Sequence, residues 1–426
     1  MPIDPKPVVL VAASTWFPLS ARLAMAFVRH GVSVPALCPA GHPLALVPGI
    51  GKLYRYRGTQ SLRSLRRAIL AAQPDLVVPC DDGVVQQLHA LHAKHSSLRP
   101  LIERSLGDPA SYPILDSRER LLALAVELGI HVPLTRSIAS ESSLAEWPLD
   151  DAVLKADGSA GGTGVAITHS VSSRLAAYRK LAQPLSGATA LKRLLVNSSP
   201  LSLWSWRTQP TRPVVAQQFI PGPPANSMIA CWQGEVLASV AVETLSSQGP
   251  TGAATVVRFI HNPQIEEACR KIARRLNLSG FHGLDFILQH DAHGLPTGDA
   301  YLIELNPRCT QLGHFVLPLQ GDLAGVLLAA LTGKPQPPPA PNTTISSDTV
   351  AFYPQALIWN PNTPYIATGY HDLPHDAPQL TAELLLEEWP YRQLPARLYH
   401  HFFPPGRDRE LPPTSQAAIA EQPLIH

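Results

Sequence analysis

The first 105 residues alternate short apolar runs with segments of helical spacing, and no other feature constrains the fold more. The strand-like runs are residues 8–12, 32–37 and 75–80. They are rich in β-branched residues, as buried parallel strands are. Helical segments lie between them: one ends before Gly31, a typical C-terminal cap, and another begins with Ser61 as its cap. Strand–helix–strand repeats of this kind predict a doubly wound α/β sheet.

Composition narrows the class of protein. The chain has 426 residues, enough for about three domains. Charged residues make up 15% and the net charge is +2, which argues against a protein that binds nucleic acid by bulk phosphate neutralisation. No apolar run is long enough to span a membrane. The five cysteines are scattered without a CxxC pair, and no secretion signal is evident, so a reducing cytoplasm is expected.

Four regions follow from the distribution of proline and of strand-like and helical patterns. We expect an N-terminal α/β domain over residues 1–105 and a second domain over 106–333, for which the family resemblance described below implies a two-lobed α+β architecture. A proline-rich linker occupies 334–341, and a C-terminal tail region covers 342–426. In the tail, residues 350–353 and 356–359 have strand-like patterns, and a short helix is expected near Leu384.

A lysine followed by a glycine-rich turn begins the first patch that suggests chemistry. Residues 153–165 read as a strand that ends near Lys155, a turn of small residues, and a second strand. Small residues let backbone N–H groups approach phosphate oxygens, and Lys155 supplies a positive charge facing a solvent-filled cleft. No Gly-Lys-Ser/Thr opens a helix here, so this is not a P-loop of the Walker type. The alternative is a flexible β-hairpin without a ligand.

Acidic and amide side chains on two later strands form the second patch. Asp285 lies in an otherwise apolar strand, where an unpaired carboxylate is costly. Glu304 and Asn306 are two residues apart on the next strand and therefore share a face. Two carboxylates and an amide oxygen suit a Mg²⁺ ion that also holds phosphates. Arg308 could bind a transferring phosphoryl group, or simply pair with an acid.

A third patch joins two amides to a turn. Gln217 and Gln218 end an apolar strand that runs through Ile220 into a Pro-Gly turn. A strand edge offers an adenine base one backbone acceptor and one donor, and an amide side chain adds a further contact. An ordinary edge strand has the same pattern.

The order of these patches resembles the ATP-grasp superfamily, most closely its biotin carboxylase and carbamoyl phosphate synthetase large-subunit branch, in a single copy. The resemblance covers about residues 105–332 and implies a phosphate lid near 155–165. The nucleotide-binding residues it implies are Arg118, Lys155, Gly158, Ser159, Gly161, Gly162, Thr163, Gly164, Gln217, Gln218 and Ile220. The metal ligands it implies are Asp285, Glu304 and Asn306, with Arg308 as the catalytic residue near the γ-phosphate.

The resemblance implies an ATP- and Mg²⁺-dependent ligase, with Mn²⁺ as a substitute metal. A small carboxylate would be phosphorylated to an acyl phosphate, which an amine then captures; a homodimer is one option for its assembly. Alternatives are an enzyme that uses bicarbonate as the acid, as carboxylases and carbamoyl phosphate synthetase do, and a non-catalytic ATP-binding protein. A nicotinamide dehydrogenase is disfavoured because the loop at 13–18 lacks GxGxxG.

Departures from the family pattern and isolated polar groups complete the expectations. Asp285 is the shorter carboxylate where glutamate is common, and residues 223–228 lack the acidic residue that often follows the Pro-Gly turn. Cys309 has no evident histidine base and is expected to pack rather than react. The cluster of His and Asp at residues 371–376 is expected at the surface. His89, His92 and His95 have a spacing that builds no zinc face.

Overall fold

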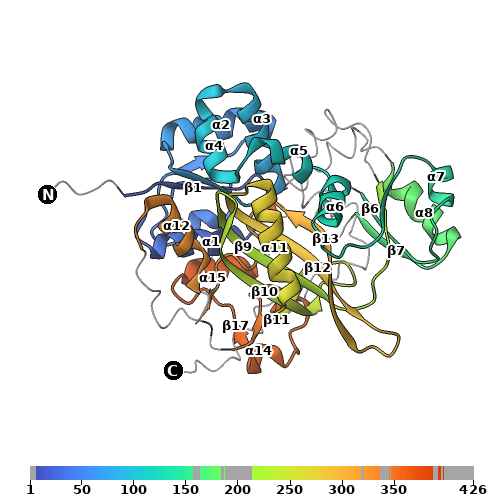
Figure 1. The fold of residues 1–426 in the computed structure, drawn as a ribbon. Helices are drawn as coiled ribbons and strands as arrows, with labels where there is room; N and C mark the ends of the chain where they lie inside the picture. The colour runs from blue at the N-terminus through green and yellow to red at the C-terminus, as the bar shows by residue number, and fades with distance from the viewer. Residues whose placement is uncertain are drawn as a thin grey trace.

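The structure is a computed structural model that describes residues 6–156, 164–183, 187, 214–317, 321–335, 345, 347–386, 392–394 and 397. Within these residues the strands form a four-stranded parallel sheet, a second four-stranded sheet, a seven-stranded sheet and a two-stranded ribbon. Figure 1 shows the parallel sheet and its helices on one side, and the second four-stranded sheet on the other, with the seven-stranded sheet between them.

The N-terminal unit confirms the doubly wound prediction. Its strands run parallel in the order β3-β2-β1-β4. They are β1 (Val9–Ala12), β2 (Ala36–Cys38), β3 (Leu53–Arg55) and β4 (Leu76–Pro79), and the helices are α1 (Leu19–Arg29), α2 (Ser61–Ala72), α3 (Asp82–Lys94) and α4 (Arg99–Leu106). The short strand β3 was not expected, and Ser61 is the first helical residue rather than the N-cap, a place that Gln60 takes without a side-chain hydrogen bond.

Alternating residues of the parallel sheet face two different layers. Leu10 and Val77 pack with side chains of α2, α3 and α4, whereas Val9 and Val11 pack with α1 and with the seven-stranded sheet. The period of two along each strand produces this division. Both faces of the sheet are therefore covered, as the uninterrupted apolar runs require.

A small lobe follows helix α6 (Arg118–Glu127), whose N-cap Ser117 accepts a hydrogen bond from the backbone N–H of Arg120. Its sheet has the order β5-β8-β6-β7 and is antiparallel. The strands are β5 (Thr135–Ile138), β6 (Ala152–Ala156), β7 (Val165–Thr168) and β8 (Val214–Gln217), with helices α7 (Glu141–Ala145) and α8 (Val171–Leu181). Figure 1 shows both helices at the outer edge of this lobe.

The large sheet has the order β13-β12-β9-β10-β11-β16-β17. Its strands before the tail are β9 (Pro224–Trp232), β10 (Glu235–Ser247), β11 (Ala254–Phe259), β12 (Gly280–His290) and β13 (Pro296–Asn306). Helix α11 (Pro263–Leu276) lies across it and buries an apolar face that includes Ile265, Cys269 and Ile272. This sheet and the small lobe together give the two-lobed α+β arrangement that the sequence predicts.

The C-terminal segment completes the large sheet. Strand β16 (Thr349–Ala351) pairs antiparallel with β11, and β17 (Tyr370–His371) pairs parallel with β16. The expected helix near Leu384 is α15 (Pro378–Leu385). The expected strand at 356–359 is wrong, because these residues belong to helix α13 (Gln355–Trp359). Periodicity alone does not separate a strand from a helical turn in so short an apolar run.

One hydrophobic cluster joins all three parts of the chain. The rings of Phe27 on α1 and Phe281 on β12 pack edge to face with their centroids 6.0 Å apart. Phe315 stacks on Phe352 of the C-terminal segment with a centroid distance of 5.8 Å. The backbones also approach closely at Gly280, whose φ is +86° and where a Cβ would lie 2.3 Å from the carbonyl oxygen of Ser105. Only glycine tolerates both conditions.

The cluster at 371–376 is not simply a surface loop, which corrects the expectation. Asp372 is 1% exposed and pairs with Arg22 and His314. The paired partners offset the cost of burying its charge. His89 and His92 instead meet single carboxylates, and the described residues contain no group of three His, Cys, Asp or Glu side chains able to hold a metal. No helix of the described residues is long and apolar enough to cross a membrane.

Candidate active site

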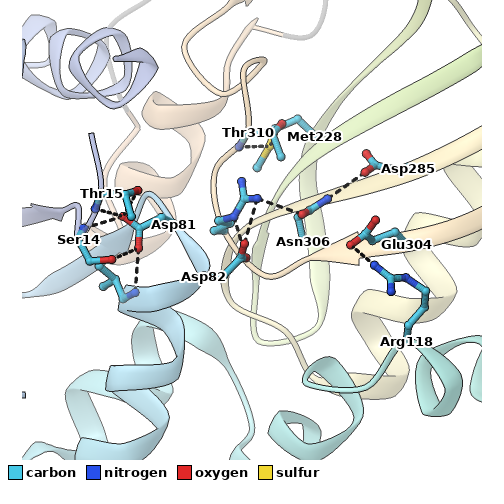
Figure 2. Close-up of polar contacts among 12 residues, drawn as sticks. Ser14, Thr15, Asp81, Asp82, Arg118, Met228, Asp285, Glu304, Asn306 and Thr310 are labelled. Carbon is cyan, nitrogen blue, oxygen red and sulfur yellow. Dashed lines mark hydrogen bonds and ion pairs between the residues drawn. The ribbon is translucent and has the colours of Figure 1, made fainter. Parts of the chain in front are cut away.

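Two carboxylates face each other on neighbouring strands of the large sheet. Asp285 on β12 is directly opposite Glu304 on β13, so both side chains project from the same face. Asn306, two residues after Glu304, lies on this face as well and donates Nδ2 to Oδ2 of Asp285 at 3.0 Å. Figure 2 shows the three side chains side by side. The structure therefore brings together the three residues that the sequence predicts as metal ligands.

Asn226 holds the other oxygen of Asp285 and was missed by the sequence analysis. It lies opposite Asp285 on β9 and donates Nδ2 to Oδ1 at 2.7 Å. Burial, followed by the nearby Glu304 carboxylate, raises the pKa of Asp285 to about 6. Asn226 lies on β9, within the segment 223–228 that lacks the acidic residue found in many members of the family. The result is a desolvated acidic pair that a cation would stabilise.

Arg118 reaches this pair from the first residue of α6. Its Nη2 donates to Oε1 of Glu304 at 2.7 Å, with 9% of the arginine side chain and 33% of the glutamate side chain exposed. Ser117 fixes the helix start immediately before it. A residue predicted to meet phosphate thus lies beside a predicted metal ligand, as Figure 2 also shows.

Arg308 joins the acidic pair to the N-terminal unit. Its Nη2 donates to Oδ1 of Asn306 at 3.2 Å, while Nε and Nη2 donate to the two carboxylate oxygens of Asp82 at 2.8 and 3.3 Å. Burial lowers the pKa of Arg308, but Asp82 outweighs that effect and the net pKa is raised. Strand β13 ends at Asn306, yet Arg308 remains next to it. The predicted ion pair between Arg308 and an acid is therefore present.

Asp81, the residue before Asp82, organises the loop after β1. Its carboxylate accepts hydrogen bonds from the backbone N–H groups of Ser14, Thr15 and Val84 at 2.6, 3.1 and 3.0 Å, and from the Ser14 hydroxyl at 2.6 Å. Burial raises its pKa. Asp81 and Asp82 follow the carboxyl end of β4, the edge at which open α/β sheets bind ligands. That position is the signal by which both residues could have been found from sequence.

Lys155 and Gln217 share one face of the small lobe. The register pairs Val153 with Gln217 and Lys155 with Val215, and these four residues alternate onto the same side. Lys155 is only 5% exposed, so the expectation that it faces a solvent-filled cleft is wrong. Gln217 donates Nε2 to the carbonyl oxygen of Ile303 on β13 at 3.3 Å. This bond ties the small lobe to the strand that carries Glu304.

The remaining predicted nucleotide contacts lie at the ends of these strands. Gln218 makes two hydrogen bonds with Leu134. The backbone N–H of Gln218 donates to the carbonyl oxygen of Leu134 at 2.8 Å, and the backbone N–H of Leu134 donates to the side-chain oxygen of Gln218 at 3.3 Å. Ile220 is buried, and the carbonyl oxygen of Gly164 accepts from the backbone N–H of Ala156 at 2.8 Å. The other predicted lid residues lie outside the described residues: Gly158, Ser159, Gly161, Gly162 and Thr163.

The donor set fits a hard divalent cation. Asp285 and Glu304 supply carboxylate oxygens on one face, and Asn306 supplies an amide oxygen beside them. Oxygen-only donors of this kind match Mg²⁺ rather than zinc, which prefers nitrogen and sulfur. The raised pKa of Asp285 is the electrostatic sign of two carboxylates brought together in a buried place.

Cys309 packs in the interior, as expected. It is 3% exposed, and burial raises the pKa of its thiol to about 12. The protonated thiol is a poor nucleophile at neutral pH. All five cysteines of the chain are free and buried.

Comparisons with known proteins place this geometry in context. A family model described as an ATP-grasp domain matches residues 120–311. Among solved structures, carboxyaminoimidazole ribonucleotide synthase from Aspergillus clavatus, complexed with ATP, has a TM-score of 0.56 at 14% identity and covers 80% of each chain. No curated protein matches the sequence.

Two further structures share the fold. The biotin carboxylase domain of 2-oxoglutarate carboxylase from Hydrogenobacter thermophilus, in complex with MgADP and bicarbonate, has a TM-score of 0.54 at 13% identity, covering 81% of this chain and 74% of the other. The L-amino acid ligase from Bacillus licheniformis has a TM-score of 0.52 at 16% identity, covering 77% and 76%.

Proposed function

We propose, from the match of residues 120–311 to a family model described as an ATP-grasp domain, that the chain is an ATP- and Mg²⁺-dependent ligase that joins a small carboxylate to an amine. The acid would be phosphorylated by ATP to an acyl phosphate, and the amine would then displace phosphate, so that the products are an amide, ADP and phosphate. The resemblance recognised in the sequence, to the ATP-grasp superfamily, agrees with the family match.

The observation that carries the proposal is the position of Asp285 opposite Glu304, with Asn306 beside them. These residues would hold Mg²⁺, which supplies charge neutralisation for the transferring phosphoryl group when bound. Two half-buried carboxylates placed opposite each other on neighbouring strands repel one another, and a divalent cation between them would offset that repulsion.

Positively charged side chains from three directions would receive the anionic reactants. Arg118 would bind phosphate oxygens beside Glu304, and Lys155 would do so from the small lobe. Arg308 lies at the far side of Asn306, where it would orient the acid and neutralise its charge as the phosphoryl group arrives. The predicted glycine-rich lid at 158–164 would exclude water from the hydrolysable acyl phosphate.

The adenine base of ATP would lie between the two lobes. Gln217 already bridges β8 to Ile303 of β13, so the residues after it run along the junction of the two lobes. We assign the adenine contacts to Gln217, Gln218 and Ile220. The backbone of Gln218 is bonded to Leu134, so a base contact there would use its carbonyl oxygen rather than its N–H.

A second candidate keeps the same first step but uses bicarbonate as the acid. It is supported by the shared fold with a biotin carboxylase domain solved with bicarbonate. Phosphorylation of bicarbonate would need the same metal ligands and the same Arg308, so the site geometry is compatible with both acids.

Product analysis tests the proposal. Purified protein would be incubated with ATP, Mg²⁺ and pools of amino acids and small carboxylates, and ADP, AMP and phosphate would be quantified. We expect substrate-dependent release of ADP and phosphate, lost in the Glu304→Gln variant. AMP and pyrophosphate as the main products would contradict an acyl phosphate route. Repeating the assay in carbonate-free buffer, with and without added bicarbonate, separates the two acids.

A further inference from the structure

A cavity of about 260 Å³ lies between helix α1 and the loop after β17, and none of its lining residues belongs to the proposed nucleotide and metal site. The loop after β13, at His314 to Val316, closes its third side. The volume far exceeds what one water molecule needs and suits a small organic ligand.

Charged groups form the floor of the cavity. Asp372 accepts a hydrogen bond from Nη2 of Arg22 and lies 2.8 Å from Nε2 of His314. The side chains of these three residues are 1–7% exposed. Such a buried group of polar side chains is costly unless each donor and acceptor is satisfied.

One donor of this group is left without a partner. The Nε–H of Arg22 is buried and makes no hydrogen bond to any residue that the structure describes, although Nη2 of the same guanidinium pairs with Asp372. A buried donor in this state loses the full free energy of its hydration, so an acceptor in the cavity would be favourable. A carboxylate oxygen is the acceptor that an arginine binds most strongly.

The cavity also has apolar lining residues, which are Met25, Phe315, Val316, Ile345, Leu373 and Pro374. They offer contacts to the hydrocarbon body of a ligand whose oxygen acceptor meets Arg22.

Two further charges lie among the lining residues. Arg29, at the last turn of α1, adds a second guanidinium, and Asp376 adds a carboxylate. The two positive charges of Arg22 and Arg29 equal the combined negative charges of Asp372 and one bound carboxylate. The negative charge of Asp376 weakens the attraction of the cavity for that carboxylate. Both Arg29 and Asp376 are exposed, so either can be replaced by an uncharged residue without disturbing the core.

We propose that this cavity is a second ligand site, which binds a small organic carboxylate with a branched aliphatic body, its carboxylate on Arg22. The site goes beyond the proposed ligase function and does not depend on it. A bound acid would bridge α1 of the N-terminal unit to the C-terminal segment.

Calorimetric titration of the full chain without nucleotide tests the proposal. The probes are 4-methylpentanoate and, as the matched control, its uncharged amide 4-methylpentanamide. We expect the acid to bind and the amide to bind at least tenfold more weakly, because the amide lacks the charge that Arg22 and Arg29 recognise. Equal affinity for both, or no binding of the acid at millimolar concentration, would overturn the proposal.

Variants locate the binding. Arg22→Lys keeps a charge opposite Asp372 but removes the Nε–H, and it should weaken binding by about tenfold. Leu373→Trp should abolish binding by filling the cavity. If Arg22→Lys does not fold, this second variant still shows whether the acid binds in the cavity. Arg29→Gln should weaken binding and Asp376→Asn should strengthen it, each by up to about fivefold, because both charges are exposed.

A control at the proposed metal site separates this proposal from the proposed function. Glu304→Gln should leave the affinity for 4-methylpentanoate unchanged. If Glu304→Gln weakens binding while Leu373→Trp does not, the acid binds at the proposed ligase site and the cavity is not a second site. A protein that shows no ligase activity but retains acid binding, sensitive to Leu373→Trp, would contradict the proposed function and leave this site standing.

Discussion

Nε of Arg308 lies 2.8 Å from Oδ1 of Asp82, although the two residues belong to different parts of the chain. Asp82 begins helix α3 of the N-terminal unit, and Arg308 follows the strand that carries Glu304 and Asn306. The same guanidinium bonds the amide oxygen of Asn306. A predicted catalytic group is thus oriented from two sides, by the sheet that carries it and by the unit that covers it.

This pair can be measured by a double-mutant cycle. We expect Asp82→Asn and Arg308→Gln each to destabilise the protein, with a coupling free energy of about 0.5–1 kcal/mol, since the side chains of Asp82 and Arg308 are 42% and 17% exposed and water screens the pair. Urea unfolding of the two single variants and the double variant provides the values. Additive effects would show that the contact contributes nothing to stability.

Lys155→Met tests the phosphate contact in the small lobe. Methionine keeps much of the buried stem and removes the ammonium group, so folding should be preserved better than with alanine. We expect affinity for MgADP to fall by about 10- to 150-fold, the loss of one charge-assisted contact. Calorimetry with MgADP measures it, and Lys180→Met on the exposed end of α8 is the matched control. Unchanged affinity in a folded Lys155→Met protein would remove Lys155 from the nucleotide site.

Glu304→Gln should reduce turnover far more than it reduces ATP binding. The proposed Mg²⁺ ligand loses its charge, and loss of charge stabilisation in phosphoryl transfer commonly costs ~10³-fold or more in rate. Adenine and lysine contacts would still hold the nucleotide. Turnover and nucleotide affinity measured over a range of Mg²⁺ concentrations distinguish the two effects.

Asn306→Asp is the milder companion to that change. The variant keeps an oxygen ligand but adds a negative charge beside Asp285, so we expect a higher Mg²⁺ requirement with partial activity. Full activity of Glu304→Gln at ordinary Mg²⁺ would mean that this strand is structural. A dead Asn306→Asp with an unchanged Mg²⁺ requirement would argue that Asn306 acts mainly by orienting Arg308.

Acid stability should depend on Asp372. Burial alone would raise the pKa of this carboxyl, but Arg22 and His314 outweigh burial and lower it to about 2. A carboxyl whose folded pKa is below its unfolded value stabilises the fold at pH above about 4, and that contribution is lost as pH falls toward 2. It amounts to about 2 kcal/mol. Unfolding free energies of the protein and of Asp372→Asn should therefore converge between pH 4 and 2; parallel curves would exclude this role.

Local patterns in the sequence were enough to predict part of the site. The spacing of two between Glu304 and Asn306 defines a common face on any strand, and an acid in an apolar strand needs a partner, which Asp285 has. These features depend on a few neighbouring residues and on the geometry of a single strand or helix.

Long-range pairing explains what the sequence could not supply. Asn226 is 59 positions from Asp285, and Asp82 is 226 positions from Arg308, so both contacts depend on how strands and units assemble. The burial of Asp372 has the same origin, because its partners Arg22 and His314 are 350 and 58 positions away. Nothing in the residues next to Asp372 distinguishes a buried charge from an exposed one.

The cluster that joins Phe27, Phe281 and Phe352 bears on how the chain could be divided. A fragment that begins after Ser105 would lack α1, so Phe281 and the neighbouring face of the large sheet would meet water. Exposed aromatic surface of that size promotes aggregation. A recombinant fragment that begins after Ser105 and keeps the rest of the chain should therefore be poorly soluble. Co-expression of the N-terminal segment as a separate polypeptide should restore solubility by re-forming the shared interface in trans.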